Sequence, residues 1–204
     1  MALPDVTRTP PAIVSDGRRA RSRSSRAKIV SAMLDLVAGG DVSPSAAQVA
    51  EVAGVGLRSV FRHFRDMDAL YREMAEAIES QILPILMRPP EGATWQQRLF
   101  DIADRRAAIF ETIMPYRISA NVRRFDSAFL MEGYRRQLRL ESEALAAYLP
   151  QAVRADAEGA RGLNVILSFS TWRLLRHDQN LAPQEAAAVV RRMLDDALAR
   201  WPQG

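Results

Sequence analysis

The sequence predicts an all-α protein. Along most of its 204 residues, apolar side chains recur at spacings of three and four, which is the period of a helix that packs on one side. No segment alternates apolar and polar residues as a strand does, and no internal repeat is visible. Capping pairs, prolines and glycines separate the periodic segments, so a succession of helices is expected.

Residues 1–24 differ from the rest of the chain. They contain three prolines and a run rich in Arg, Ser and Gly without apolar periodicity, which predicts a disordered basic arm. The first 65 residues carry ten basic against five acidic side chains, whereas the remainder carries 18 basic and 19 acidic ones. A basic region beside a near-neutral one indicates a polyanionic partner for the first region only.

Three helices are expected in residues 25–66, each with a recognisable start or stop. The expected boundaries are Ser25 to the Gly39-Gly40 pair for the first helix, the Ser45 and Gln48 capping box to Gly54 for the second, and Leu57 to Phe64 for the third. Two short helices after a longer one are not typical of a plain helical bundle.

The second and third helices meet the local demands of a helix-turn-helix. Ala50 is small where the helices cross, Gly54 can adopt the positive φ of the turn, and Val60 is apolar where the third helix packs back. Packing Leu57 or Val60 inward together with Phe64 leaves polar side chains outward. These are Arg58, Ser59, Arg62 and His63, which can hydrogen-bond to bases or, for a partly protonated histidine, meet a phosphate.

Residues 67–204 are expected to form a second helical domain. The expected helices are 67–83, capped by Asp66 and interrupted by Pro84; 94–114, opened by the Thr94 and Gln97 capping box and ended by Pro115; 126–149, capped by Asp126; 153–177; and 183–201, opened by Pro183. Apolar residues occupy nearly every side of the helix between Leu163 and Leu175. Such a helix needs cover on two faces, which a partner subunit or the centre of a monomeric bundle would supply.

Residues 48–74, QVAEVAGVGLRSVFRHFRDMDALYREM, resemble the DNA-binding signature of the TetR family of transcriptional repressors. The resemblance implies an N-terminal three-helix DNA-binding domain with a helix-turn-helix in residues 25–66, followed by a C-terminal helical ligand-binding and dimerisation domain in residues 67–204. The implied contacts to bases come from Leu57, Arg58, Ser59 and Arg62, and those to the DNA backbone from Ser45, Phe61, His63, Arg21, Arg23 and Arg26.

Three positions depart from the family pattern. Phe61 stands where the family normally has a tyrosine, Met67 where it has a lysine, and Leu57 where a polar or basic residue is more frequent. These differences predict fewer phosphate contacts from the motif itself, with the arginines from Arg18 to Arg26 partly compensating.

The resemblance also implies a homodimer that binds a palindromic double-stranded DNA operator. The helices at about 153–177 and 184–201 are expected to form the dimer contact. Repression, and release of the operator by an unknown small-molecule effector, are expected from the habit of the family alone. Aromatic and arginine side chains of the second domain could line an effector pocket or form ordinary core and surface, and the sequence does not assign them.

An enzyme is the first alternative, and the sequence argues against it. The chain has no cysteine, no Gly-rich phosphate loop with a lysine, and two histidines far apart, His63 and His177, so no catalytic group, metal site or cofactor is expected. A helical interaction module, or a protein that binds DNA without sequence preference, is the second alternative. The chain has no apolar run near the roughly 20 residues of a membrane span and no signal-peptide pattern, so a cytoplasmic location is expected.

Overall fold

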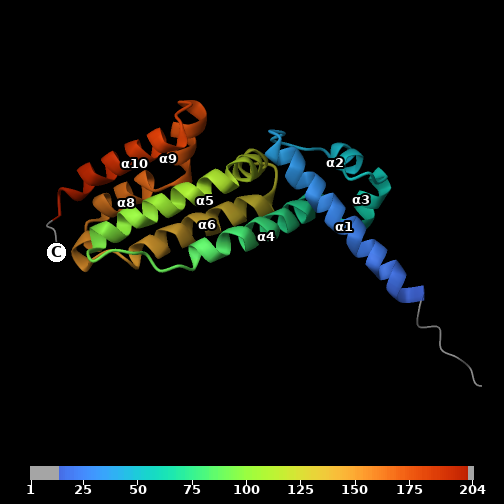
Figure 1. Ribbon diagram of the computed structural model, residues 1–204, viewed down its shortest axis with the longest axis horizontal. Coiled ribbons are helices and arrows are strands. Elements are labelled where there is room, and N and C mark those ends of the chain that lie inside the picture. Colours follow the sequence, from blue (N-terminus) through green and yellow to red (C-terminus); the bar gives the residue numbers. More distant parts are fainter. Residues whose placement is uncertain (1–13, 202–204) are drawn as a thin grey trace, which may run out of the picture.

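The computed structural model describes residues 14–201, with side chains from Ser22 onward, and contains helices but no strand within that range (Figure 1). The all-α prediction is confirmed. Helix α1 and the two short helices α2 and α3 form one end of the molecule, and the longer helices from α4 onward form the other. A helix-rich sequence of this kind buries its apolar stripes between helices, and the core runs through both ends.

The first three helices pack around a small apolar core. They are α1 (Val14–Ala38), α2 (Ala46–Val52) and α3 (Leu57–His63), and α1 contacts both of the others. Ile29, Met33 and Val37 of α1 are buried at helical spacing, and Gly40, with a φ of 99°, turns the chain after the helix. The predicted C-terminal ends of these helices agree with the structure to within about two residues, and the capping box of Ser45 and Gln48 is confirmed.

The predicted disorder of residues 1–24 is wrong for residues 14–24, because α1 begins at Val14. Alanine and arginine favour helices, and adding residues to an existing helix costs little compared with starting one. Helix α1 therefore continues beyond its packed part towards the N-terminus (Figure 1). The remainder of the predicted arm, residues 1–13, lies outside the described residues.

Helix α4 (Met67–Leu86) joins the two ends of the molecule and contacts α1 and α5. Asp66 caps it as predicted, since its Oδ1 accepts the Ala69 N–H at 2.8 Å. The helix continues past Pro84, where an interruption was predicted. A proline within the last turn removes one hydrogen bond and has a φ that suits a helix, so only two further residues follow it.

The C-terminal half is built around one long helix. Its elements are α5 (Trp95–Arg123), α6 (Ala128–Ala146), α7 (Gln151–Ala155), α8 (Ala157–Ile166), α9 (Phe169–Arg173), a π-helix η1 (Leu174–Asp178) and α10 (Pro183–Leu198). Helix α5 contacts α4, α6, α9 and α10, which explains its central place in Figure 1. The Thr94 and Gln97 capping box and Pro183 at the start of α10 are confirmed.

Two boundaries in α5 and α6 differ from the prediction. Helix α5 continues through Pro115, because Ile113, Arg117 and Ser119 on both sides of it are buried and this packing outweighs one lost hydrogen bond. Ser127, not Asp126, caps α6: its hydroxyl accepts the Leu130 N–H at 3.1 Å.

The continuous helix predicted for residues 153–177 is wrong, since two breaks divide it into three segments, and the last of these changes from α9 into the π-helix η1 without interruption. Asp156 caps α8 by accepting the Gly159 N–H at 3.0 Å, and Ser168 caps α9 by accepting the Thr171 N–H at 3.2 Å. The Arg106 guanidinium bonds to the carbonyl oxygen of Leu167 at 2.9 Å and so occupies an acceptor at the second break. Capping side chains compete with the helix for backbone groups, which the apolar pattern does not reveal.

Helix α10 shows a single apolar stripe. Ala186, Val190, Leu194 and Leu198 are buried against α5 and α8, whereas the outward side carries charged residues such as Arg192 and Asp196. Among residues 14–201, no helix combines the length and the hydropathy that crossing a membrane demands.

Candidate nucleic-acid interface

The turn between α2 and α3 is set by backbone hydrogen bonds around Gly54. Its φ is 63°, in the left-handed region that favours glycine. The Gly54 N–H donates to the Glu51 carbonyl at 3.1 Å, and the Val55 N–H donates to the Ala50 carbonyl at 3.0 Å. Gly56 is then the N-terminal cap of α3. The local sequence therefore places α3 at a fixed angle to α2.

Helix α3 is held against the protein by one side. Val60 is 2% exposed and Phe64, which follows the helix, is also 2% exposed. Ala50 of α2 is buried at the helix crossing, which agrees with the demand for a small residue there. Of the two apolar residues offered for the inward position, Val60 occupies it and Leu57 does not.

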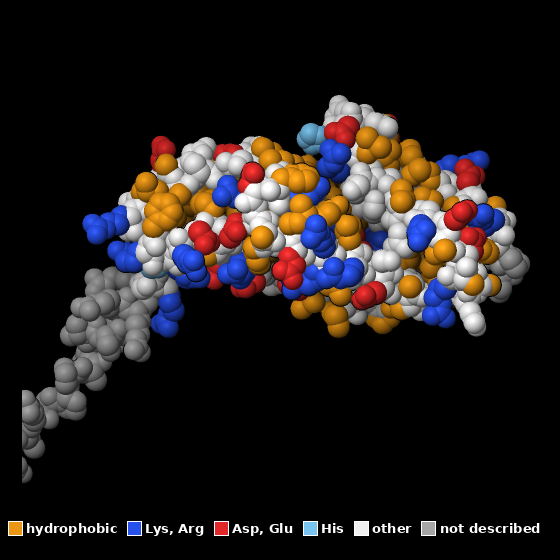
Figure 2. Space-filling model, turned by 180° about the vertical axis from the view of Figure 1, so that it is seen from behind, with side chains coloured by type: hydrophobic (Ala, Val, Ile, Leu, Met, Phe, Trp, Pro, Cys, Tyr) orange, Lys and Arg blue, Asp and Glu red, His pale blue; other side chains and the backbone are white. Residues whose placement is uncertain are grey.

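The outward side of α3 carries two apolar and two basic side chains. Leu57 and Phe61 are 46% and 52% exposed, and Arg58 and Arg62 are exposed beside them. At 3.6 residues per turn, these four side chains cover less than half of the helix circumference. Figure 2, in which the end formed by α1 to α3 lies on the left, shows basic side chains beside apolar ones at this end. An exposed helix of this composition suits the major groove, where arginine bonds to guanine and apolar groups meet the thymine methyl.

Ser59 and His63 lie at the edge of this face and are half-buried. Burial lowers the pKa of His63, and the charges of Arg62 and Arg26 lower it further. The Nε2 atom of His63 is buried without a hydrogen-bond partner in the described part of the protein. The ring is therefore expected to be neutral at pH 7, so the protonated histidine considered from the sequence is disfavoured.

The predicted backbone contacts outside α3 are spread over α1 and α2. Ser45 is exposed, and its hydroxyl accepts the Gln48 N–H at 3.3 Å. Arg23 is exposed on α1, whereas the side chain of Arg21 lies outside the described part of the chain. Two basic residues of this end were not singled out from the sequence. These are Lys28, exposed on α1, and Arg65, whose side chain is 94% exposed directly after α3.

Arg26, a predicted contact to the DNA backbone, is bonded within the protein. Its guanidinium bonds to both carboxylate oxygens of Glu73, at 2.6 and 3.2 Å, and to the carbonyl oxygen of His63 at 2.7 Å. It also lies 4.4 Å from the centre of the Phe64 ring. Nothing in the local pattern indicates this pairing, because Glu73 is 47 positions away along the chain.

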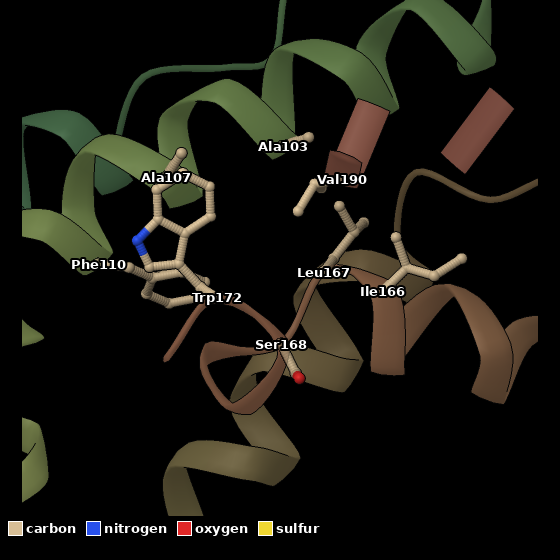
Figure 3. Close-up of a pocket in the computed structure, with 8 residues that line it drawn as sticks. All are labelled: Ala103, Ala107, Phe110, Ile166, Leu167, Ser168, Trp172 and Val190. Atoms are coloured by element: carbon tan, nitrogen blue, oxygen red, sulfur yellow. The ribbon is translucent and has the colours of Figure 1, made fainter. Parts of the chain in front are cut away.

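Two hollows of very different size lie in the described part of the C-terminal half. The one in Figure 3 lies among Ala103, Ala107, Phe110, Leu167, Trp172 and Val190 and has a volume of about 10 Å³, room for one water molecule at most. The other is an open groove of about 670 Å³ between α5, α6, α8 and α9. Its lining combines apolar residues (Leu138, Val165, Leu174) with charged and hydroxyl-bearing ones (Arg106, Glu141, Arg161, Ser142, Thr171).

Neither a protein-family model nor a curated protein sequence matches the chain. Solved structures do. A transcriptional regulator from Rhodococcus sp. is 18% identical, with a TM-score of 0.63 over 85% of this chain and 96% of the other. A regulator from Mesorhizobium loti assigned to the TetR family is 16% identical, with a TM-score of 0.60 over 88% and 97% of the two chains.

NalD of Pseudomonas aeruginosa, the secondary repressor of the MexAB-OprM multidrug efflux pump, is 19% identical, with a TM-score of 0.55 over 87% and 96% of the two chains. At these identities the likeness concerns the arrangement of the helices. The chain therefore has the fold of TetR-family transcriptional regulators.

Proposed function

We propose that the protein is a transcriptional regulator of the TetR family that binds a palindromic operator as a homodimer. The observation that carries this proposal is the exposed face of α3, which follows a glycine turn and presents Arg58 and Arg62 beside Leu57 and Phe61. In helix-turn-helix proteins this second helix enters the major groove, and a dimer spaces two such helices one DNA turn apart. The fold shared with solved regulators supports the same function.

The side chains of α3 are assigned to different parts of the DNA. Leu57, Arg58, Ser59 and Arg62 are the proposed base contacts. Phe61 and His63, with Ser45, Arg21 and Arg23 from the preceding helices, are the proposed contacts to the backbone. Phe61 has no hydroxyl to donate to a phosphate, so it would contact the sugar or a thymine methyl instead.

The experiment that tests the function is selection of DNA sequences from a random pool by the purified protein. The wild type is expected to enrich a palindrome, and an Arg58→Ala, Arg62→Ala variant is expected to lose that enrichment. Arg135→Ala, Arg136→Ala on α6 removes two exposed arginines and the same charge elsewhere, so this control should select the wild-type site. Absence of enrichment by the wild type, or equal enrichment by the α3 variant, would contradict the proposal.

Contact between Leu57 and a thymine methyl can be tested on the selected operator. Uracil lacks only the C5 methyl group, so replacing individual thymines by uracil removes that contact and leaves base pairing intact. The wild type should bind the substituted operator more weakly at one position per half-site, whereas Leu57→Ala should not distinguish the two operators there. The same discrimination in both proteins would place the methyl contact on another residue.

The proposed dimer surface uses α8 and η1 more than α10. Val165 is 64% exposed and Leu174 is 45% exposed, whereas the apolar stripe of α10 is already covered. Val165→Glu with Leu174→Glu should shift the protein to a monomer in sedimentation, because a dimer would bury both carboxylates. Val122→Glu is the matched control, since Val122 is 51% exposed on α5 and lies outside these two helices. An unchanged dimer in the double variant would exclude this surface.

Repression and release by an effector complete the proposal. The groove between α5, α6, α8 and α9 has the volume of a small-molecule site, and its mixed lining can orient a ligand. Val165 and Leu174 belong to both surfaces, so in the proposed dimer the partner subunit would border this groove. A compound that releases a labelled operator from the wild type should fail with Ser142→Trp, which fills the groove, and act normally on Glu143→Trp, which points elsewhere on α6. Equal release from both variants would place the effector outside the groove.

A further inference from the structure

Arg26 joins three helices through one guanidinium group. It projects from α1, donates to Glu73 of α4 through Nε and one terminal nitrogen, and donates to the His63 carbonyl of α3 through the other. The Glu73 contact is two-pronged, which is the strongest arrangement of an arginine and a carboxylate. The His63 contact satisfies a carbonyl in the last turn of α3, which has no partner within its own helix.

Such a bond matters for α3 because few side chains anchor it, namely Val60 within the helix and Phe64 directly after it. It has seven residues, and Val60 is its only buried member. Its neighbours in the described part of the protein are chiefly α2 and α1. A short helix with one buried side chain is marginal by itself, so its orientation is set by contacts at its ends. The start of α3 is fixed by the turn at Gly54, and its end is fixed by Arg26.

The same contacts argue against a direct bond between Arg26 and DNA. All three nitrogens of the guanidinium donate within the protein, and one face of the group lies on the Phe64 ring. Three of the five guanidinium N–H groups are used in these bonds, and the adjacent Glu73 carboxylate repels a phosphate that approaches the other two. The side chains of Arg26 and Glu73 are 41% and 32% exposed, so burial alone does not stabilise the pair and the two-pronged geometry contributes as much.

We propose that Arg26 and Glu73 form a clamp that fixes the angle of α3 relative to α4, making Arg26 a positioning residue and not a phosphate contact. In the proposed dimer this angle sets the distance between the two α3 helices, so that part of the inference rests on the proposed function. Without the clamp, α3 keeps the side chains that face DNA, but its angle relative to α4 is no longer fixed. The expected consequence is weaker binding with a wider tolerance for the spacing of the two half-sites.

The first test needs no DNA. Hydrogen exchange of the peptide covering residues 57–64 is measured in wild type, Arg26→Gln, Glu73→Gln and Glu79→Gln. The last removes an exposed carboxylate from the same helix and is the matched control. Both clamp variants should exchange roughly three- to tenfold faster than the control in this peptide, with α5 and α10 unchanged. Equal exchange in all four proteins would overturn the clamp, whatever the protein binds.

The second test uses the selected operator and separates a clamp from a phosphate contact. Arg26→Lys keeps the charge that a phosphate requires but cannot form the two-pronged bond, so the clamp predicts that it behaves like Arg26→Gln. If Arg26 is part of a clamp, Glu73→Gln should weaken operator binding roughly three- to tenfold and leave the salt slope unchanged. If Arg26 instead contacts a phosphate, Glu73→Gln frees its guanidinium and should strengthen binding. Both clamp variants should also accept operators with one base pair added between the half-sites.

The two proposals can fail separately. If the wild type enriches no palindrome but exchange of α3 rises in both clamp variants, the clamp stands and the DNA function fails. If the wild type selects a palindrome and both clamp variants show the hydrogen-exchange rates and the half-site spacing preference of the wild type, the function stands and the clamp is wrong. Operator binding by Arg26→Lys with the affinity and the spacing preference of the wild type would likewise overturn the clamp.

Discussion

Replacement of Gly54 by alanine should loosen the turn that places α3. The φ of Gly54 is 63°, and an L-residue pays about 1–2 kcal/mol to adopt the left-handed region. A Cβ atom at this position would meet nothing within 4 Å, so no steric clash adds to that figure. A loss of about 1–2 kcal/mol corresponds to a roughly 5- to 30-fold larger population of molecules with an opened turn.

The measurement is hydrogen exchange of the Val55 amide, which donates to the Ala50 carbonyl across the turn. Hydrogen exchange at this amide is a better measurement than global unfolding, because α2 and α3 can open while the C-terminal half stays folded. Gly56→Ala is the matched control: Gly56 has a φ of −69° and open space around its Cα, so alanine causes no backbone strain there and loses only the preference of the N-cap position for glycine over alanine. Gly54→Asn should fall between the two, since asparagine tolerates the left-handed region better than alanine. Equal exchange in Gly54→Ala and Gly56→Ala would refute the assignment of the turn to the positive φ.

Three further outcomes are expected. Arg176 lowers the pKa of Glu111 below its ordinary value of 4.5, so the stability that this carboxylate contributes is complete above that value and disappears as the pH falls through the lower folded-state pKa. Urea unfolding of wild type and Glu111→Gln should therefore differ at neutral pH and converge in acid. The NMR titration of His63 should have its midpoint below 6.5, because burial and two neighbouring guanidinium groups disfavour the imidazolium; protonation below that value should destabilise the fold. Gly133→Ala, inside α6 with open space around it, should raise the free energy of unfolding by about 0.5–1 kcal/mol, as measured by denaturant unfolding.

The features that the sequence predicted well depend on neighbours in the chain. The capping box of Ser45 and Gln48 and the turn at Gly54 involve residues within a few positions of each other, and each is present in the structure. Helical spacing narrowed the inward position to Leu57 or Val60, and the structure has Val60 there. These local preferences were enough to place the helix-turn-helix before any tertiary contact was known.

The features that the sequence missed depend on contacts between distant segments. Pro115 does not end α5, because buried residues on both sides of it keep the helix together. Ser127 rather than Asp126 caps α6, and its hydroxyl also bonds to Asp68 of α4, 59 positions away. Glu73 could not be identified as the partner of Arg26 for the same reason. Local patterns give the propensity of a segment, and packing decides between segments of similar propensity.

Helix α4 is bonded to both halves of the molecule within its first two turns. The hydroxyl groups of Tyr71 and Ser119 lie 2.8 Å apart in a buried hydrogen bond between α4 and α5, while Glu73 binds Arg26. A displacement of α5 at Ser119 therefore acts on α4 within one turn of the residue that holds α3. The far end of α4 is more weakly held, since Leu83 and Met87 are exposed there. If the proposed effector release operates, the Tyr71 end of α4 is therefore a shorter route to α3 than a swing of the whole helix about Pro84.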